Sequence, residues 1–134
     1  MVKSNIKMNS GKLEEFIRIL VPEVEDEIVN IEGSEDERNF IVKASNLRKT
    51  VEFSYEKIGR SFEEQLDVMA KIVLLKLYDK NYKWGSLIGV RPTKIVRRFL
   101  DSGFNLNYIE NLLREFYQVS KEKAELLIDV VKRE

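Results

Sequence analysis

The stretch WGSLIGVRPTK, residues 84–94, separates a strand-rich half of the chain from an all-helical half. Gly85 and Gly89 can adopt backbone angles that are closed to other residues, or allow another backbone to approach closely. Pro92 fixes its own φ and cannot donate a hydrogen bond, so it suits the first turn of a helix. Arg91 precedes a proline and is therefore pushed out of helical space. We expect an extended Arg91 and a helix that begins near Pro92, with the glycines and the proline as structural positions.

The start of this expected helix is a candidate anion-binding site. Unpaired N–H groups of a first helical turn, together with the helix dipole, favour a negative charge. Arg91 and Lys94 lie beside that turn, and a guanidinium can bind a carboxylate or phosphate through two hydrogen bonds. The alternative, of equal weight, is that Arg91 pairs with a structural carboxylate or caps a neighbouring helix. The candidate substrate- or anion-binding residues are Arg91, Thr93, Lys94, Arg97, Arg98 and Trp84.

Charge is unevenly distributed along the chain, although the net charge is zero. Eight acids and no base lie between Glu23 and Glu37, a run that is typical of a solvated strand edge and turn. Six bases and no acid lie between Lys80 and Arg98. Because the basic run coincides with the glycines and the proline, it is the stronger candidate for a functional surface.

Composition limits the class of protein. The 134 residues fit one domain with a hydrophobic core, and 43% hydrophobic and 34% charged residues are typical of a soluble protein. No apolar run approaches the roughly 20 residues of a membrane-spanning helix, and no signal peptide is recognisable, so we expect a cytoplasmic protein without membrane contact. The chain has no cysteine and no histidine, which excludes disulfides, thiolate nucleophiles, the usual zinc sites and histidine bases. We expect neither a metal site nor catalytic residues in this chain.

The hydrophobic pattern predicts an α+β fold: a small, mostly antiparallel four-stranded sheet covered by helices, followed by a helical C-terminal half. Period-two alternation predicts strands over residues 2–8, 27–31, 40–44 and 49–57, with turns at Gly33-Ser34 and Asn46-Leu47. Helical spacing and capping residues predict helices that begin at Ser10, at a capping box over residues 61–64, at Pro92, at Asn107 and after Ser120. We expect a single domain over residues 1–134, strand-rich over 1–60 and helical over 61–134.

The run W-G-S-L-I-G-V-R-P-T-K-I-V-R, residues 84–97, resembles a segment from the amino-terminal region of HemZ-type proteins. These belong to the oxygen-independent coproporphyrinogen III oxidase/dehydrogenase group of radical S-adenosylmethionine enzymes. The matching positions are Trp84, Gly85, Leu87, Gly89, Arg91, Pro92, Thr93 and Lys94. The basic helix closed by Gly103 and the helices after it also fit, whereas residues 1–60 match only in general character. Lys83 and Ile88 depart from the family pattern, where proline and threonine are expected, and the second change removes a hydroxyl.

The resemblance implies that the chemistry belongs to a following radical S-adenosylmethionine barrel. There a C-x3-C-x2-C motif holds a [4Fe–4S] cluster that cleaves S-adenosylmethionine, and propionates of a porphyrinogen are oxidatively decarboxylated. A chain without cysteine can hold no such cluster, so both cofactors are expected only in a downstream domain. The chain would then be a non-catalytic amino-terminal fragment of an oxidoreductase of porphyrin and heme biosynthesis. Its expected partners are its own catalytic domain and coproporphyrinogen III.

Three functions remain open from the sequence. An accessory domain would use the basic helix to help bind substrate or to dock on the catalytic barrel. An RNA-binding module would place the basic segment 80–98 on a phosphate backbone and stack Tyr82 and Trp84 on bases. A pI near 6.4 and the acidic Asp101 on the same helix face argue against nucleic acid. A purely structural domain would dock the barrel or form a homodimer, with Trp84 as a packing anchor.

Overall fold

The computed structural model describes residues 2–6, 10–22, 27–59, 64–87 and 90–134. Contacts divide the chain into two compact units, Met1–Asn81 and Tyr82–Glu134. The described strands precede residue 60 and helices follow it, so the predicted α+β fold with a helical C-terminal half is confirmed. The helix that follows residue 64 nevertheless groups with the sheet. No helix in these ranges is long and apolar enough to cross a lipid bilayer.

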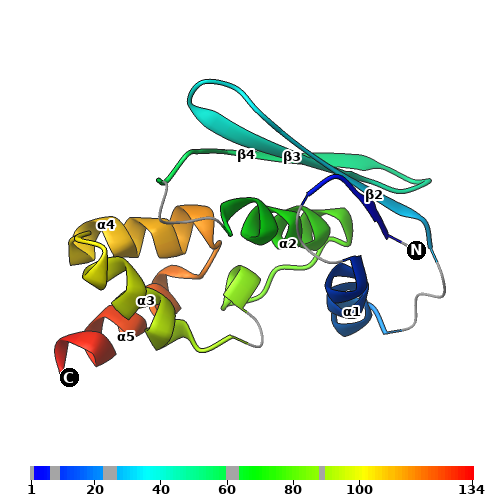
Figure 1. Ribbon diagram of the computed structural model, residues 1–134. Coiled ribbons are helices and arrows are strands. Elements are labelled where there is room, and N and C mark those ends of the chain that lie inside the picture. Colours follow the sequence, from blue (N-terminus) through cyan, green and yellow to red (C-terminus); the bar gives the residue numbers. More distant parts are fainter. Residues whose placement is uncertain (1, 7–9, 23–26, 60–63, 88–89) are drawn as a thin grey trace. The chain divides into compact units, whose positions relative to one another are not determined.

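The first unit is built on a four-stranded sheet with the strand order β1-β2-β3-β4 (Figure 1). Its strands are β1 (Val2–Ser4), β2 (Val29–Glu35), β3 (Asn39–Ser45) and β4 (Thr50–Glu56). β1 runs parallel to β2, whereas the other two pairs are antiparallel, which confirms the mostly antiparallel sheet. A parallel pair needs a crossover connection, and the helix α1 (Ser10–Leu20) lies in that connection.

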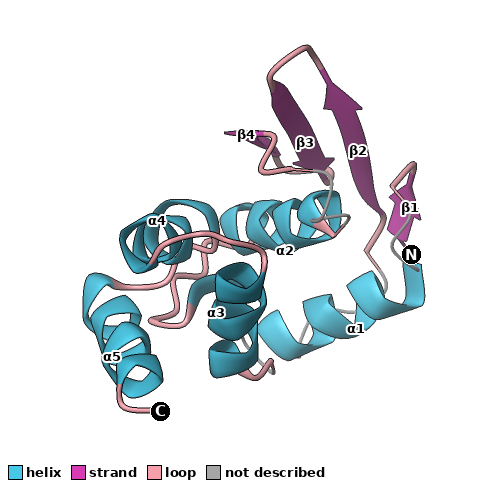
Figure 2. Ribbon diagram, turned by 60° about the vertical axis from the view of Figure 1, so that its left-hand side comes forward, coloured by secondary structure: helices cyan, strands magenta, loops and turns pink. Residues whose placement is uncertain are grey.

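Two helices, α1 and α2 (Gln65–Leu77), lie on the same face of the sheet (Figures 1 and 2). Alternate strand residues face these helices, and Val29, Ile31, Val42 and Ala44 are fully buried. The buried apolar residues of α2 are Met69, Ala70, Ile72, Val73, Leu74, Leu75 and Leu77. Burying a large apolar side chain contributes roughly 1.5–3 kcal/mol before entropy is counted. These residues make α2 the centre of the core of the first unit.

One buried polar side chain ties the start of α2 to the end of β4. Gln65 is 1% exposed. Its Nε2 donates to the carbonyl of Glu56 at 2.8 Å, and its Oε1 accepts from the N–H of Ile58 at 2.9 Å. Because both ends of the amide are hydrogen-bonded, its burial carries little penalty. The capping box predicted over residues 61–64 falls largely outside the described residues.

The turn between β3 and β4 lies where it was predicted. Asn46 Oδ1 accepts from the backbone N–H groups of Arg48 at 2.9 Å and Lys49 at 3.0 Å. The asparagine side chain thus accepts hydrogen bonds from turn N–H groups that have no partner in the strands. This local signal was readable from the sequence.

The turn between β2 and β3 lies at Asp36, and the predicted turn at Gly33-Ser34 is wrong. Asp36 Oδ1 accepts from the N–H groups of Asn39 at 2.7 Å and Arg38 at 2.9 Å. These backbone hydrogen bonds, the one from Asn39 first, hold the pKa of the Asp36 carboxyl below its usual value. Gly33 lies within β2 instead, where its N–H donates to Asn5 Oδ1 at 2.7 Å. A glycine inside a strand marks close approach of another segment, and that is its role here.

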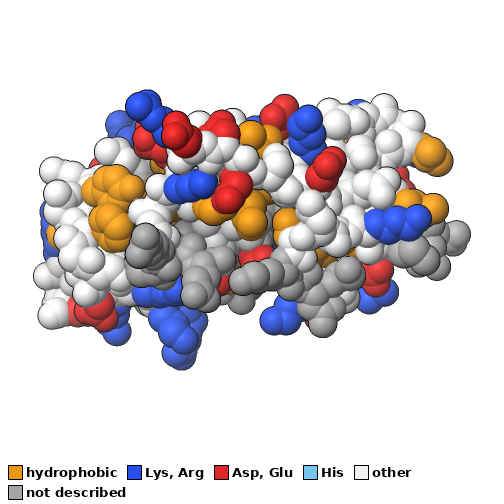
Figure 3. All heavy atoms as spheres, turned by 45° about the horizontal axis from the view of Figure 1, so that its top comes forward, with side chains coloured by type: hydrophobic (Ala, Val, Ile, Leu, Met, Phe, Trp, Pro, Cys, Tyr) orange, Lys and Arg blue, Asp and Glu red, His pale blue; other side chains and the backbone are white. Residues whose placement is uncertain are grey.

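The opposite face of the sheet carries charged side chains. The strand register places Lys43 of β3 opposite Glu32 of β2 on one side and Glu52 of β4 on the other. All three residues are exposed, and directly paired opposite charges stabilise neighbouring strands. Figure 3 shows Lys, Arg, Asp and Glu side chains interspersed on the face it draws.

The second unit contains α3 (Pro92–Asp101), α4 (Leu106–Asn111) and α5 (Lys121–Lys132), with a π-helix, η2 (Leu112–Phe116), that continues α4 (Figure 2). The core residues of α4, η2 and α5 include Ile109, Leu112, Leu113, Phe116, Ala124, Leu127 and Ile128, which are buried, whereas Val131, also expected to face inward, is half-buried. Tyr117 lies in the same core, with its ring centroid 6.4 Å from that of Phe99. Burial of this size explains how short helices form a compact unit.

Asparagine and serine side chains cap two of these helices. Ser120 Oγ accepts from the N–H of Lys123 at 3.2 Å, as predicted for the start of α5. The start predicted at Asn107 is wrong, because Asn105 caps α4 and its Oδ1 accepts from the N–H of Tyr108 at 2.8 Å. Asparagine is a favoured N-cap residue at either position. Asn105 is the cap because its backbone is extended, as an N-cap requires.

Candidate functional site

The motif segment is hydrogen-bonded to the turn that follows η2. Its first part forms a short 3₁₀ helix, η1 (Gly85–Leu87). The N–H and the Oγ of Ser86 both donate to the carbonyl of Tyr117, at 2.9 and 3.1 Å. The carbonyl of Lys83 accepts from the N–H of Ser120 at 2.8 Å. Since Ser86 is buried, its hydroxyl serves the structure and is not presented to a ligand.

Gly85 is the position at which this segment requires a glycine. Its φ is +55°, and a Cβ added there would lie 2.3 Å from the carbonyl oxygen of Tyr117 and 2.5 Å from the carbonyl carbon of Gln118. Both reasons expected for a glycine, a left-handed backbone and a close approach, therefore apply at Gly85. The second glycine of the motif, Gly89, lies outside the described residues, as does Ile88.

Trp84 is half-buried and is covered on its ring by a cation of the same unit. Lys123 Nζ lies 5.4 Å from the ring centroid. Such a cation–π contact contributes about 0.5–1 kcal/mol at an exposed site. The surroundings of the ring favour a packing role, and ligand stacking on Trp84 stays a prediction.

The start of α3 has the local geometry predicted from Pro92. Arg91 is the residue before the helix and is extended, with φ −76° and ψ 103°, and Pro92 occupies the first turn. Arg91 and Lys94 are exposed, whereas Thr93 is half-buried. Arg91 offers no side-chain hydrogen bond to the helix that it precedes. The first-turn N–H groups therefore receive no cap from it.

The basic face of α3 contains both paired and unpaired cations. Arg97 forms an ion pair with Glu134. Within the described part of the chain, neither Arg91 nor Lys94 forms an ion pair, and both are exposed, as is Arg98. The structure thus brings Arg91 and Lys94 to one end of α3 and engages Arg97 elsewhere. The ligand-binding role of these cations stays a prediction.

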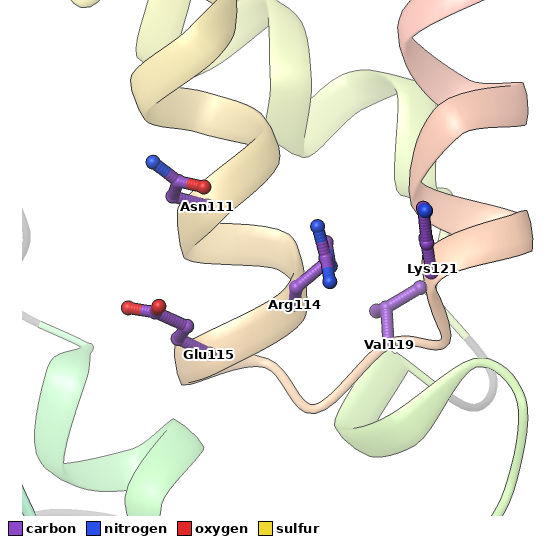
Figure 4. A pocket seen from close by; sticks show the side chains of 5 residues that line it. All are labelled: Asn111, Arg114, Glu115, Val119 and Lys121. Atoms are coloured by element: carbon purple, nitrogen blue, oxygen red, sulfur yellow. The ribbon is translucent and has the colours of Figure 1, made fainter.

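A hollow that the sequence did not indicate lies between η2 and α5 (Figure 4). Its volume is about 360 Å³, and it is lined by Asn111, Arg114, Glu115, Val119 and Lys121. Arg114 and Lys121 lie on facing sides of it. Arg114 and Glu115 lie in the π-helix η2, and no residue pattern in the sequence marks a π-helix. Without that geometry, the juxtaposition of Arg114 and Lys121 could not be predicted.

The chain does not offer the donors that an iron–sulfur cluster needs. Among the described residues, no group of three or more acidic, histidine or cysteine side chains could hold a metal ion. Iron–sulfur clusters are ligated mainly by cysteine thiolates, and the sequence has no cysteine. The cluster implied by the resemblance therefore does not fit the residues of this chain.

The chain is similar to the oxygen-independent coproporphyrinogen-III oxidase-like protein HemZ of Bacillus subtilis (strain 168), with 27% identity over 126 residues. The aligned region covers 90% of this chain but 24% of the relative, so the chain spans about a quarter of that protein's length. No family model and no solved structure matches the chain. The similarity relates this chain, distantly, to part of a HemZ protein, in agreement with the resemblance seen in residues 84–97.

Proposed function

We propose that this chain is a non-catalytic accessory domain of a protein related to oxygen-independent coproporphyrinogen III oxidases, and that Arg91 and Lys94 contact carboxylates of its substrate. The similarity to the HemZ protein supports the assignment to that group. The observation that carries the contact surface is the exposure of Arg91 and Lys94 without an ion pair among the described residues. A substrate of this group carries several propionate carboxylates, which such cations suit.

The start of α3 has the electrostatic properties that a carboxylate requires. The first-turn N–H groups have no intrahelical acceptor, and the helix dipole places partial positive charge at this end. Pro92 holds Arg91 in an extended conformation, which directs its side chain from a fixed position beside the helix. Lys94 follows within the first turn. One carboxylate, or two carboxylates of one molecule, can therefore meet two cations and the helix end together.

Binding of coproporphyrin III, the oxidised form of the porphyrinogen, to the 134-residue chain tests the contact surface. The double variant Arg91→Ala/Lys94→Ala is expected to weaken binding at least about tenfold, because hydrogen bonds to charged groups contribute about 1.5–3 kcal/mol each. The control Lys12→Ala/Arg48→Ala removes two exposed cations of the first unit and should leave the Kd unchanged. Equal losses in both double variants would contradict the contact.

Docking on the catalytic part of the same protein is a second candidate, favoured by the ion pair between Arg97 and Glu134. That pair places a protein carboxylate on the basic face of α3. In the longer protein, charge reversal by Arg91→Glu/Lys94→Glu would then weaken the association of the two parts, measured by co-purification after separate expression. Retained co-purification together with a raised KM would favour substrate contact over docking.

Sequencing the native gene past the codon for Glu134 tests the assignment itself. We expect three cysteines in C-x3-C-x2-C spacing downstream, in the region that the relative possesses beyond its similarity to this chain. A stop codon directly after Glu134 would contradict the accessory-domain proposal, whatever the binding experiments show. The assignment and the contact surface can therefore fail independently.

A further inference from the structure

We infer that the hollow between η2 and α5 binds a small zwitterionic molecule, with its anionic group on Arg114 and Lys121 and its ammonium group on Glu115. The volume of about 360 Å³ lies within the range of small-molecule sites, roughly 300–1,000 Å³. All the lining side chains except Val119 carry polar or charged groups. A small polar ligand suits this lining better than an apolar one.

Two cations face each other in the hollow. Arg114 belongs to η2 and Lys121 to α5, and Figure 4 shows their side chains on facing sides. Arg114 forms no ion pair within the described ranges. Glu125 Oε1 lies 4.0 Å from Lys121 Nζ, and both side chains are more than half exposed, so water screens this contact. An anion placed between the two cations would relieve their repulsion.

The dipole of α5 does not explain the presence of Lys121, whose i,i+4 contact with Glu125 is long and exposed. It is the first residue of this helix, where the helix dipole favours acidic rather than basic side chains. Ser120 already caps the helix through the N–H of Lys123. A cation at this position therefore opposes the helix dipole, and contact with an anion gives it a function.

Glu115 and Asn111 supply the complementary chemistry. Both line the same hollow, and Figure 4 shows them along the same helical segment as Arg114. A carboxylate and an amide oxygen accept hydrogen bonds, and a carboxylate pairs most strongly with an ammonium group. A ligand with charges of both signs is therefore matched at both ends, whereas a simple anion is matched at one.

The backbone that frames the hollow adopts uncommon conformations. In η2 the N–H of Tyr117 donates to the carbonyl of Leu112 at 3.0 Å, five residues earlier. The next residue, Gln118, has a φ of +62°. Single π turns and left-handed non-glycine residues occur frequently at functional sites and persist where surrounding structure holds them. Here Ser86 donates two hydrogen bonds to the carbonyl of Tyr117 and Gly85 lies against the same turn, so the motif segment supports one wall of the hollow.

The test uses O-phosphoethanolamine, β-alanine and inorganic phosphate, each titrated into the isotope-labelled 134-residue chain at constant ionic strength. Saturable changes in the amide shifts of Arg114 and Lys121 are expected for a zwitterion. The first two probes both carry an ammonium group, so the tighter of them identifies the anion as phosphate or carboxylate. Inorganic phosphate has no ammonium group and is expected to bind about tenfold more weakly than the better zwitterion.

Variants distinguish this site from general attraction to surface charge. Arg114→Ala should weaken the binding of the tighter-binding zwitterion at least about tenfold. Glu115→Gln should weaken the binding of this zwitterion without weakening the binding of phosphate. Arg133→Ala, an exposed cation of the same unit, should change neither. Shifts that do not saturate, or equal losses for Arg114→Ala and Arg133→Ala, would overturn the site. Equal affinity for phosphate and both zwitterions would overturn the contact with Glu115.

Discussion

Replacement of Gly85 by alanine is expected to destabilise the second unit by about 2–5 kcal/mol. A left-handed backbone costs a residue with a Cβ roughly 1–2 kcal/mol. The added Cβ would lie 2.3 Å from the carbonyl oxygen of Tyr117 and 2.5 Å from the carbonyl carbon of Gln118, which are backbone atoms of a hydrogen-bonded turn. Forcing extra volume into a filled site costs about 1–3 kcal/mol.

The sequence supplies both a probe and a matched control for this measurement. Trp84 is the single tryptophan of the chain, so its fluorescence during urea unfolding reports on the motif segment itself. Gly103 also has a positive φ, +96°, but a Cβ there would meet nothing within 4 Å. Gly103→Ala therefore carries the backbone strain without the clash and should cost roughly 1–2 kcal/mol.

The difference between the two variants isolates the close approach of the motif to the turn. Both substitutions lower the entropy of the unfolded chain by a similar amount, so this effect cancels in the comparison. We expect Gly85→Ala to cost about 1–3 kcal/mol more than Gly103→Ala. If Gly85→Ala lowered the free energy of unfolding by the same amount as Gly103→Ala or by less, the turn at Tyr117 would move aside easily. That result would refute the inference that the motif segment supports this turn.

Three further changes test the fold by direction and size. Ser120→Ala should destabilise the second unit by about 1 kcal/mol through loss of the α5 cap, measured by urea unfolding. Lys43→Glu aligns three carboxylates across the outer face of the sheet, at roughly 0.2–1 kcal/mol for each like-charged pair, and added salt should reduce the loss. Burial, and then its hydrogen bond to Glu27 at 2.6 Å, raise the pKa of Tyr78 above the usual value of about 10. Folding therefore favours the neutral phenol. The contribution of Tyr78 to the free energy of unfolding is complete below about pH 10 and declines above it. Tyr78→Phe should lessen this alkaline decline, measured by urea unfolding at successive pH values.

Features with a short-range cause could be predicted from the sequence. Pro92 fixes its own φ and keeps Arg91 out of the helical region, and Asn46 binds the N–H groups of its own turn. In these cases the residues that decide the conformation lie within a few positions of each other. The start of α3 and the turn between β3 and β4 follow from this alone.

Features that depend on distant partners could not be predicted in this way. Glycine is a common turn residue, but the role of Gly33 is decided by its hydrogen bond with Asn5. The parallel pairing of β1 and β2 brings Asn5 to it. Gly85 likewise meets Tyr117 only after α3, α4 and η2 have folded back on the motif segment. The hollow between η2 and α5 requires a π-helix that has no recognisable residue pattern.

The motif stretch therefore divides into two parts with different physical roles. The N–H and the hydroxyl of Ser86 both donate to the carbonyl of Tyr117, and there is no space for a side chain at Gly85. Neither residue therefore presents a side-chain group to a ligand. Arg91 and Lys94 have the opposite character, because they are exposed and form no ion pair among the described residues. Substitutions in the first part should change stability before binding, and substitutions in the second should change binding alone. If Arg91→Ala/Lys94→Ala instead lowered stability as Gly85→Ala does, the whole stretch would be structural and the substrate contact would have to be sought elsewhere.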